Sequence, residues 1–165
     1  MLIAYTGTHG TGKTTAVFER AASLKKEHSG KTVGIITEVA SQSPYKINKE
    51  TTVESQMWIF TKQISTELEM VKKYDIVVTD RTPVDCIAYT QVACLSGLAD
   101  EMKRLVWFHM RLYNEINFKT IKNNDYWFAD GVRDASDQNF RESVEEKMVS
   151  LYAGMVIGSN NFRVI

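Results

Sequence analysis

A run rich in glycine and threonine, GTHGTGKTT, spans positions 7–15, one residue after the apolar segment MLIAY. It fits the pattern Gly-x-x-x-x-Gly-Lys-[Ser/Thr], which is typical of loops that bind phosphate groups. Glycines allow positive φ angles and a close approach of backbone N–H groups to an anion, and the start of a following helix adds N–H donors and a partial positive charge. The residues expected to hold the phosphates of a nucleotide are Gly7, His9, Gly10, Thr11, Gly12, Lys13, Thr14 and Thr15.

Two side chains of this loop have chemistry of their own. Lys13 would place a positive charge beside the terminal phosphates of ATP, and the Thr14 hydroxyl is placed to ligate Mg²⁺. His9 stands at a variable position of the pattern, which favours a spacer over a catalyst. A short apolar strand at residues 2–6 and helical spacing in residues 14–26 surround the loop, and phosphate-binding loops require this strand–loop–helix order. The loop therefore predicts nucleotide binding.

Acidic residues end two further predicted strands. Glu38 closes residues 31–38, and Asp80 closes residues 75–80. An apolar strand that ends in aspartate is typical of the Walker B position, whose carboxylate holds Mg²⁺ directly or through water. A carboxylate at position 38 is placed to take a proton from an acceptor hydroxyl or to hold a metal-bound water. The sequence leaves open which of Glu38 and Asp80 is the catalytic base.

Arginines complete the candidate catalytic set. Arg81 follows Asp80 directly, and its planar guanidinium suits a phosphate or the charge of the transferred group. Arg133 follows a fourth predicted strand at 125–130, where an arginine on a closing loop would neutralise the transferred phosphoryl group. The candidate catalytic residues are Lys13, Glu38, Asp80, Arg81 and Arg133, and the candidate Mg²⁺ ligands are Thr14 and Asp80.

The segments that must position these residues alternate between strands and helices. Apolar stretches predict strands at 2–6, 31–38, 75–80 and 125–130, with one or two more in 155–165, and helical spacing predicts helices at 14–26, 53–74, 83–97, 100–121 and 137–154. This alternation predicts the α/β class: a three-layer P-loop NTPase/kinase fold with a mostly parallel central sheet, formed by residues 1–165 as one domain. Ligands of such sheets bind at the carboxyl ends of the strands, so the residues named above are expected to meet there.

Two of the predicted helices carry apolar stripes that we expect to face the core. In the helix at 53–74 the stripe consists of Val53, Met57, Phe60, Ile64, Leu68 and Val71. In the helix at 100–121 it consists of Leu105, Phe108, Leu112 and Ile116.

The composition narrows the class of protein. The chain has 165 residues, 44% of them hydrophobic, which suits a globular domain with a core of its own. Its net charge is zero, so there is no overall basic field that would attract nucleic acid or an anionic membrane. No apolar run approaches the roughly 20 residues that span a bilayer, and the first residues lack the charged region of a signal peptide. These features predict a cytoplasmic protein without a membrane partner.

Blocks along nearly the whole chain resemble one known group. The loop GTHGTGKTT, TEVA after the second strand, SPYKINKETTVESQMWI, VVTDRTPVDCIAY and DGVRD together resemble the NadR-like small P-loop ATPase/kinase family, which is related to thymidylate kinases and deoxynucleoside kinases. The resemblance implies that Gly7 to Thr15 hold the ATP phosphates and that Glu38 matches the base of deoxynucleoside kinases. It also implies that Asp80 and Arg81 match the Asp/Glu-Arg pair of both relatives, and that Arg133 stands where a lid arginine is expected. The chain is shorter there than a thymidylate kinase.

The combined expectation is an ATP- and Mg²⁺-dependent kinase that moves the γ-phosphoryl group to a nucleoside- or nucleotide-like acceptor. One alternative is a phage-type kinase that acts on 5-hydroxymethyluracil in DNA. For that reaction a local basic groove would have to form, and basic residues gather at Lys103, Arg104, Arg111, Lys119 and Lys122. A further alternative is a regulatory ATPase switch without a phosphorylated product. The sequence leaves open whether the protein forms a homodimer.

Overall fold

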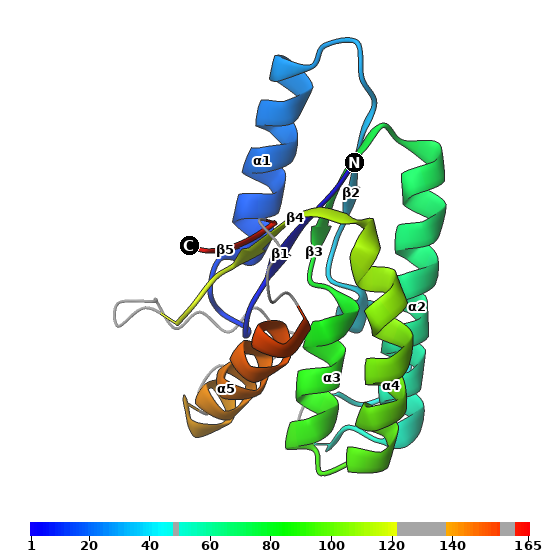
Figure 1. Ribbon diagram of the computed structural model, residues 1–165, viewed down its shortest axis with the longest axis vertical. Coiled ribbons are helices and arrows are strands. Elements are labelled where there is room, and N and C mark those ends of the chain that lie inside the picture. Colours follow the sequence, from blue (N-terminus) through cyan, green and yellow to red (C-terminus); the bar gives the residue numbers. More distant parts are fainter. Residues whose placement is uncertain (48–49, 122–137, 156–160) are drawn as a thin grey trace.

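The computed structural model describes residues 1–47, 50–121, 138–155 and 161–165 (Figure 1). The strands are β1 (Leu2–Thr6), β2 (Val33–Ile36), β3 (Ile76–Asp80), β4 (Tyr113–Phe118) and β5 (Phe162–Val164). The helices are α1 (Lys13–Glu27), α2 (Val53–Lys73), α3 (Pro83–Val92), α4 (Ser96–His109) and α5 (Gln138–Met155), with short 3₁₀ helices η1 (Val39–Gln42) and η3 (Met110–Leu112). None of the described helices is long and apolar enough to cross a membrane.

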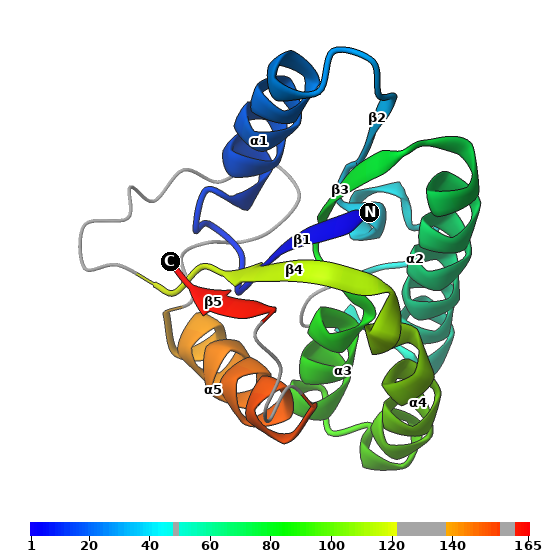
Figure 2. The same ribbon diagram turned by 45° about the horizontal axis from the view of Figure 1, so that its top comes forward.

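The strands form one parallel sheet in the order β2-β3-β1-β4-β5 (Figure 2). β1 lies in the middle of the sheet, with β3 on one side and β4 on the other. Parallel neighbours end at the same edge of a sheet, so the residues that follow β1, β2 and β3 lie near one another. The predicted α/β fold with its parallel sheet is confirmed.

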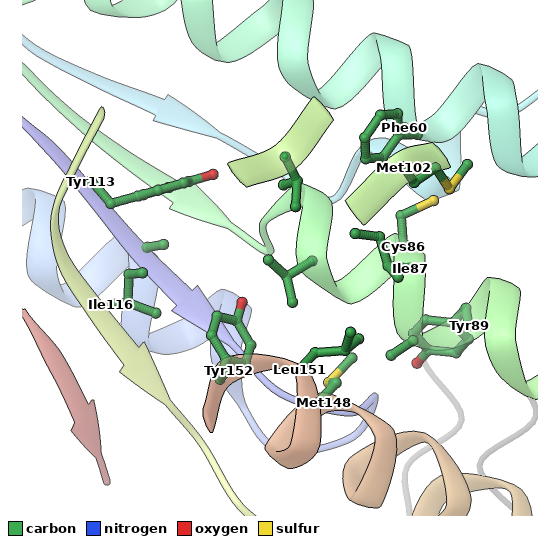
Figure 3. Close-up of a cluster of buried hydrophobic side chains, with 14 of the residues drawn as sticks. Phe60, Cys86, Ile87, Tyr89, Met102, Tyr113, Ile116, Met148, Leu151 and Tyr152 are labelled. Atoms are coloured by element: carbon green, nitrogen blue, oxygen red, sulfur yellow. The ribbon is translucent and has the colours of Figure 1, made fainter. Parts of the chain in front are cut away.

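Alternation along β1 separates two apolar layers. Ile3 and Tyr5 face α1, where they pack with Val17, Ala21 and Leu24. Leu2 and Ala4 face the opposite side, which α2, α3, α4 and α5 cover. Figure 3 shows part of this larger cluster, in which Ile87 of α3 and Met148 of α5 come together. The sheet therefore lies between two helical layers, as the three-layer prediction requires.

The helix predicted at 100–121 is confirmed over residues 100–109 and wrong beyond them. The helix α4 ends at His109, and Tyr113–Phe118 form strand β4 beside β1. The stripe expected to be buried is mostly turned outward, because α4 buries the neighbouring face, made by Ala99, Met102, Val106 and His109. Leu105, Phe108 and Leu112 are exposed, and Ile116 is buried in the strand.

Other boundaries also shift. The helix predicted at 83–97 ends at Val92, and Gly97 lies inside α4 instead of ending α3. The strand predicted at 125–130, together with Arg133, lies outside the described residues. One strand in the C-terminal tail, β5, is confirmed.

The buried face of α2 is partly polar, against expectation. Phe60 of the predicted stripe is buried, but Val53, Met57 and Leu68 are exposed. The positions that face inward are Ser55, Gln56, Phe60, Gln63 and Glu67. Buried polar side chains need hydrogen-bond partners, and those of Gln63 include Thr79 and the Arg81 carbonyl oxygen at the carboxyl end of β3.

Candidate active site

The predicted phosphate-binding loop connects β1 to α1. Gly7 has a φ of 131° and Gly12, which precedes the first turn of α1, has a φ of 72°. A Cβ atom on Gly7 would lie 2.2 Å from the backbone oxygen of Lys119 at the end of β4. No larger side chain fits there, so the glycine is required both by its backbone conformation and by the close approach of β4. The loop has the geometry expected of an anion nest at a helix N-terminus.

Lys13 lies folded into this loop. Its side chain is buried, and its Nζ donates hydrogen bonds to the Thr8 carbonyl oxygen at 2.6 Å and to the Thr11 hydroxyl at 3.3 Å. Burial, together with the positive charge of Arg81, lowers the pKa of Lys13 to about 7, although nearby carboxylates partly offset this shift. An anion in the loop would stabilise the charged amine, which is the state that binds phosphate.

Thr14 and Asp80 meet between the loop and β3. The Thr14 hydroxyl donates a hydrogen bond to Asp80 Oδ2 at 2.5 Å. The other carboxylate oxygen of Asp80, Oδ1, is buried and has no hydrogen-bond partner among the described residues. A hydroxyl beside a carboxylate with one unused oxygen fits the ligand chemistry of Mg²⁺, which takes few protein oxygens and completes its shell with water and phosphate. No cluster of three or more His, Cys, Asp or Glu side chains suited to a metal occurs in the part of the chain that the structure describes.

Arg81 lies at the centre of the strand ends with a backbone conformation that is unusual for arginine. Its φ is 80°, and its N–H donates to the Tyr5 carbonyl oxygen at 2.8 Å. Its Nε donates to Glu38 at 2.8 Å, and its Nη1 reaches the Gly7 carbonyl oxygen at 3.2 Å. Burial alone would lower the pKa of Arg81, but Glu38 and the other negative groups around it raise that pKa well above its usual value. The guanidinium therefore connects the segments that follow β1, β2 and β3.

Asp85 binds the other side of this guanidinium. Its Oδ2 lies 3.5 Å from Arg81 Nη1, and its Oδ1 accepts hydrogen bonds from Thr6 and, at 3.1 Å, from the Tyr152 hydroxyl. Burial raises the pKa of Asp85, whereas Arg81 and the hydrogen bond from Thr6 act in the opposite direction. Tyr152 comes from α5 (Figure 3), so its hydrogen bond to Asp85 joins that helix to the site.

A chain of buried side chains holds the carbonyl group of Arg81. Gln63 Nε2 donates to the Arg81 carbonyl oxygen at 3.3 Å and to Glu67 Oε1 at 2.6 Å. The Thr79 hydroxyl donates to the same carbonyl at 3.2 Å. Glu67 is completely buried, and its other oxygen is hydrogen-bonded by His109 at 2.6 Å and by the Tyr113 hydroxyl at 2.5 Å. A strained backbone conformation, such as the positive φ of Arg81, persists where surrounding contacts fix it. The hydrogen bonds from Gln63 and Thr79 are contacts of this kind.

The tip of the loop is fixed by two distant helices. The ring of His9 is buried, and its Nδ1 lies 3.0 Å from the hydroxyl of Tyr89 in α3. Arg141 of α5 is also buried, and its Nε donates to the His9 carbonyl oxygen at 3.2 Å. The ring of Tyr89 in turn stacks under Arg81, whose guanidinium carbon lies 5.5 Å from the ring centre. His9 thus connects the loop to α3 and α5.

A small pocket opens beside Arg81, between η1, α2 and α3. Its volume is about 30 Å³, and Val39, Ile59 and Cys86 form part of an apolar wall. Gln56, Gln63, Arg81, Asp85 and Tyr89 contribute polar atoms to the same pocket. The lining, an apolar wall with a few convergent polar groups, is typical of a site for a small organic molecule. A volume of about 30 Å³ holds only one or two water molecules, so the wall would have to open to admit a larger molecule.

Sequence reasoning missed several residues of this site. Gln63 and Glu67 carry no local signal, because their partners are distant in the chain. Lys119 was grouped with a basic helical segment, but it follows β4, and its Nζ donates to the Gly12 carbonyl oxygen at 3.3 Å. A correct strand assignment would have found it, because the carboxyl end of β4 lies beside the loop. Arg133 lies outside the described residues, so the structure does not place it.

The chain matches a family model described as AAA domain over residues 2–160. No curated protein matches it. Among solved structures, thymidylate kinase from Ehrlichia chaffeensis is similar, with a TM-score of 0.67 and 17% identity over 100% of this chain and 91% of that chain. Deoxyadenosine kinase from M. mycoides, with the products dCMP and dCDP, gives a TM-score of 0.60 and 16% identity, over 100% of this chain and 89% of that one. The same enzyme with bound dATP gives a TM-score of 0.57 and 15% identity, over 100% of this chain and 90% of that one.

At these identities the likeness to the solved structures concerns the fold. The narrower resemblance to NadR-like proteins stays a prediction. The match across residues 2–160, on a parallel sheet whose first strand leads into a loop with the phosphate-binding pattern, shows that the chain belongs to the AAA-domain family, with a fold similar to those of thymidylate kinase and deoxyadenosine kinase.

Proposed function

We propose that this protein transfers the γ-phosphoryl group of ATP to a nucleoside- or nucleotide-like acceptor, with Mg²⁺ as the metal. The observation that carries the proposal is the meeting of three strand ends. The loop with Lys13, the Thr14–Asp80 pair and the Glu38–Arg81 pair lie together at one edge of the sheet. They supply a phosphate site, a metal site and a carboxylate for the acceptor.

On the nucleotide side, the backbone N–H groups of the loop would hold the phosphates of ATP. Lys13 would turn from the Thr8 carbonyl oxygen to the terminal phosphates, where its charge stabilises the transferred group. Thr14 and Asp80 would hold Mg²⁺, which when bound neutralises phosphate charge and orients the terminal phosphates. Positioning and electrostatics do most of the work in this kind of reaction.

On the acceptor side, the molecule would enter the pocket next to Arg81. An oxygen of the acceptor attacks the γ-phosphorus while the bond to the bridging oxygen breaks and ADP leaves. Glu38 is the proposed proton acceptor for this oxygen, with Asp80 as the other carboxylate at the strand ends. Arg133 is proposed to approach the transferred group from the segment outside the described residues.

A transfer assay with γ-labelled ATP tests the proposal. The acceptors are nucleosides, nucleoside monophosphates, nicotinamide riboside and DNA that contains 5-hydroxymethyluracil. We expect a labelled small-molecule product that depends on Mg²⁺ and is absent with Lys13→Ala. ATP turnover that no acceptor changes would contradict the proposal and favour an ATPase switch, and labelling of DNA alone would favour the DNA kinase.

A further inference from the structure

We infer that the acceptor is a neutral hydroxyl compound of the nucleoside type and that the site disfavours a phosphate monoester such as a nucleoside monophosphate. The inference rests on the proposed phosphoryl transfer and narrows its acceptor. It comes from the contacts that already occupy Arg81, the cation of the acceptor pocket among the described residues.

Neither edge of the Arg81 guanidinium has both of its nitrogens unoccupied for bidentate binding of a phosphate. A guanidinium binds phosphate in bidentate fashion through Nε with one terminal nitrogen, or through both terminal nitrogens. Nε is bonded to Glu38 at 2.8 Å, and Nη1 contacts both the Gly7 carbonyl oxygen at 3.2 Å and Asp85 at 3.5 Å. Each bidentate edge therefore contains a nitrogen that already has an acceptor. A phosphate would have to displace Glu38 or Asp85.

The charges around the pocket add to this obstacle. Glu38 and Asp85 flank the single positive charge of Arg81, and their side chains are 16% and 1% exposed. Water screens such partly buried charges weakly, so a dianionic phosphate would meet strong repulsion from Glu38. A neutral hydroxyl meets no such repulsion and can donate its hydrogen bond to that carboxylate.

For residues 122–137, which lie outside the described residues, only the charge that the sequence gives can be stated. By sequence, residues 122–137 contain Lys122 and Arg133 but four acidic residues. These acidic residues are Asp125, Asp130, Asp134 and Asp137. By sequence, this segment has a net charge of −2 and therefore no excess of positive charge.

With a hydroxyl group as the acceptor, every bond and proton of the transfer can be accounted for. The acceptor oxygen forms a bond to the γ-phosphorus, the bond between phosphorus and the bridging oxygen breaks, and its electron pair leaves with ADP. The hydroxyl proton goes to Glu38. Arg81 then acts by holding Glu38 in place, through the ion pair of 2.8 Å between Arg81 Nε and Glu38 Oε1. It does not bind a phosphate of the acceptor.

The kinetic test compares each nucleoside with its own 5′-monophosphate. Thymidine and dTMP, deoxyadenosine and dAMP, and deoxycytidine and dCMP are assayed with ATP and Mg²⁺. We expect one or more nucleosides to be phosphorylated with a kcat/KM about 100-fold above that of the matching monophosphate. A monophosphate that is the better acceptor overturns the inference but leaves the proposed kinase function standing.

A binding test separates failure of the inference from failure of the kinase function. The Nε–H resonance of Arg81 is followed by NMR in arginine-labelled protein, with ADP and Mg²⁺ filling the nucleotide site. Nucleosides should shift this resonance, while inorganic phosphate and the monophosphates at millimolar concentration should not. A shift caused by phosphate overturns the inference even if no acceptor is turned over, and so does the lack of any response to the nucleosides. If nucleosides bind without transfer, the kinase proposal is the one that fails.

A matched pair of variants tests the cause. Glu38→Gln removes the charge next to Arg81, so the affinity for monophosphates should rise about tenfold while transfer to nucleosides falls. Glu50→Gln changes the net charge equally, but Glu50 is exposed and pairs with Lys46, so it should change neither. An unchanged monophosphate affinity in Glu38→Gln would show that its charge does not set the preference.

Discussion

The nucleotide half and the acceptor half of the site are built in opposite ways. The nucleotide half is one stretch of chain, residues 7–15, whose shape follows from glycines and the start of α1. The acceptor half is centred on Arg81 and takes side chains from α2, α3, α5 and the segment after β2. A contiguous loop can serve any reaction that needs a bound nucleotide, whereas the assembled half fixes which molecule receives the phosphoryl group.

The largest effect should come from the nucleotide half. In Lys13→Ala, kcat should fall at least about 100-fold, because one preorganised charge on the transferred group is lost. Steady-state kinetics measure this, and circular dichroism checks the fold. The KM for the acceptor should stay within a few-fold of the wild-type value. Near-normal turnover in a folded Lys13→Ala protein would remove the role given to this loop.

Arg81→Lys should damage the acceptor half and spare the nucleotide half. Lysine keeps the charge but cannot bond Glu38, Gly7 and Asp85 at once from a planar group. We expect kcat/KM for the acceptor to fall about tenfold or more, with an unchanged KM for ATP. Unchanged acceptor kinetics would mean that the guanidinium geometry has no part in the reaction.

The pH dependence of ATP binding should report on Lys13, and therefore on the nucleotide half of the site. In the free protein the pKa of Lys13 is lowered to about 7, and bound phosphate favours the charged amine. Binding of ATP should therefore take up a proton at pH 8, and affinity should fall by up to about tenfold per pH unit above pH 7. Calorimetry in buffers of different ionisation enthalpy measures the uptake, which should vanish below about pH 6. Lys13→Ala is the control, and uptake that persists in it would assign the proton to another group.

The smallest expected effect concerns the support of Arg81. Gln63→Met keeps the size of the side chain but removes the donor to the Arg81 carbonyl oxygen, so acceptor kcat/KM should fall a few-fold. If Gln63 acts through Arg81, the change should have no further effect in an Arg81→Lys background, which a double-mutant cycle measures. Val106→Ala, a buried change in α4, is the control for lost stability alone. Fully additive effects would contradict the link.

The same contrast explains how far the sequence could predict the structure. The phosphate-binding loop was found from spacing alone, and charged residues at the strand ends indicated Glu38, Asp80 and Arg81, whose contacts the structure now describes. β4 was missed because YNEINF is short, mixes polar and apolar residues, and continues the helical spacing of α4 by coincidence. The inward face of α2 was missed because Gln63 and Glu67 look like surface residues until their tertiary partners are known. Roles in catalysis stay predictions.

The attachment of the loop to α5 has a consequence for how the chain is made. The loop ends at residue 15, but its contacts to Arg141 and, through Thr6, to Tyr152 join residues 132 and 146 positions apart. Contacts of such long range form late in folding, because the intervening chain must first be ordered. A nascent chain on the ribosome therefore carries the sequence of the loop long before it has a supported binding site, which is complete only after α5 has emerged.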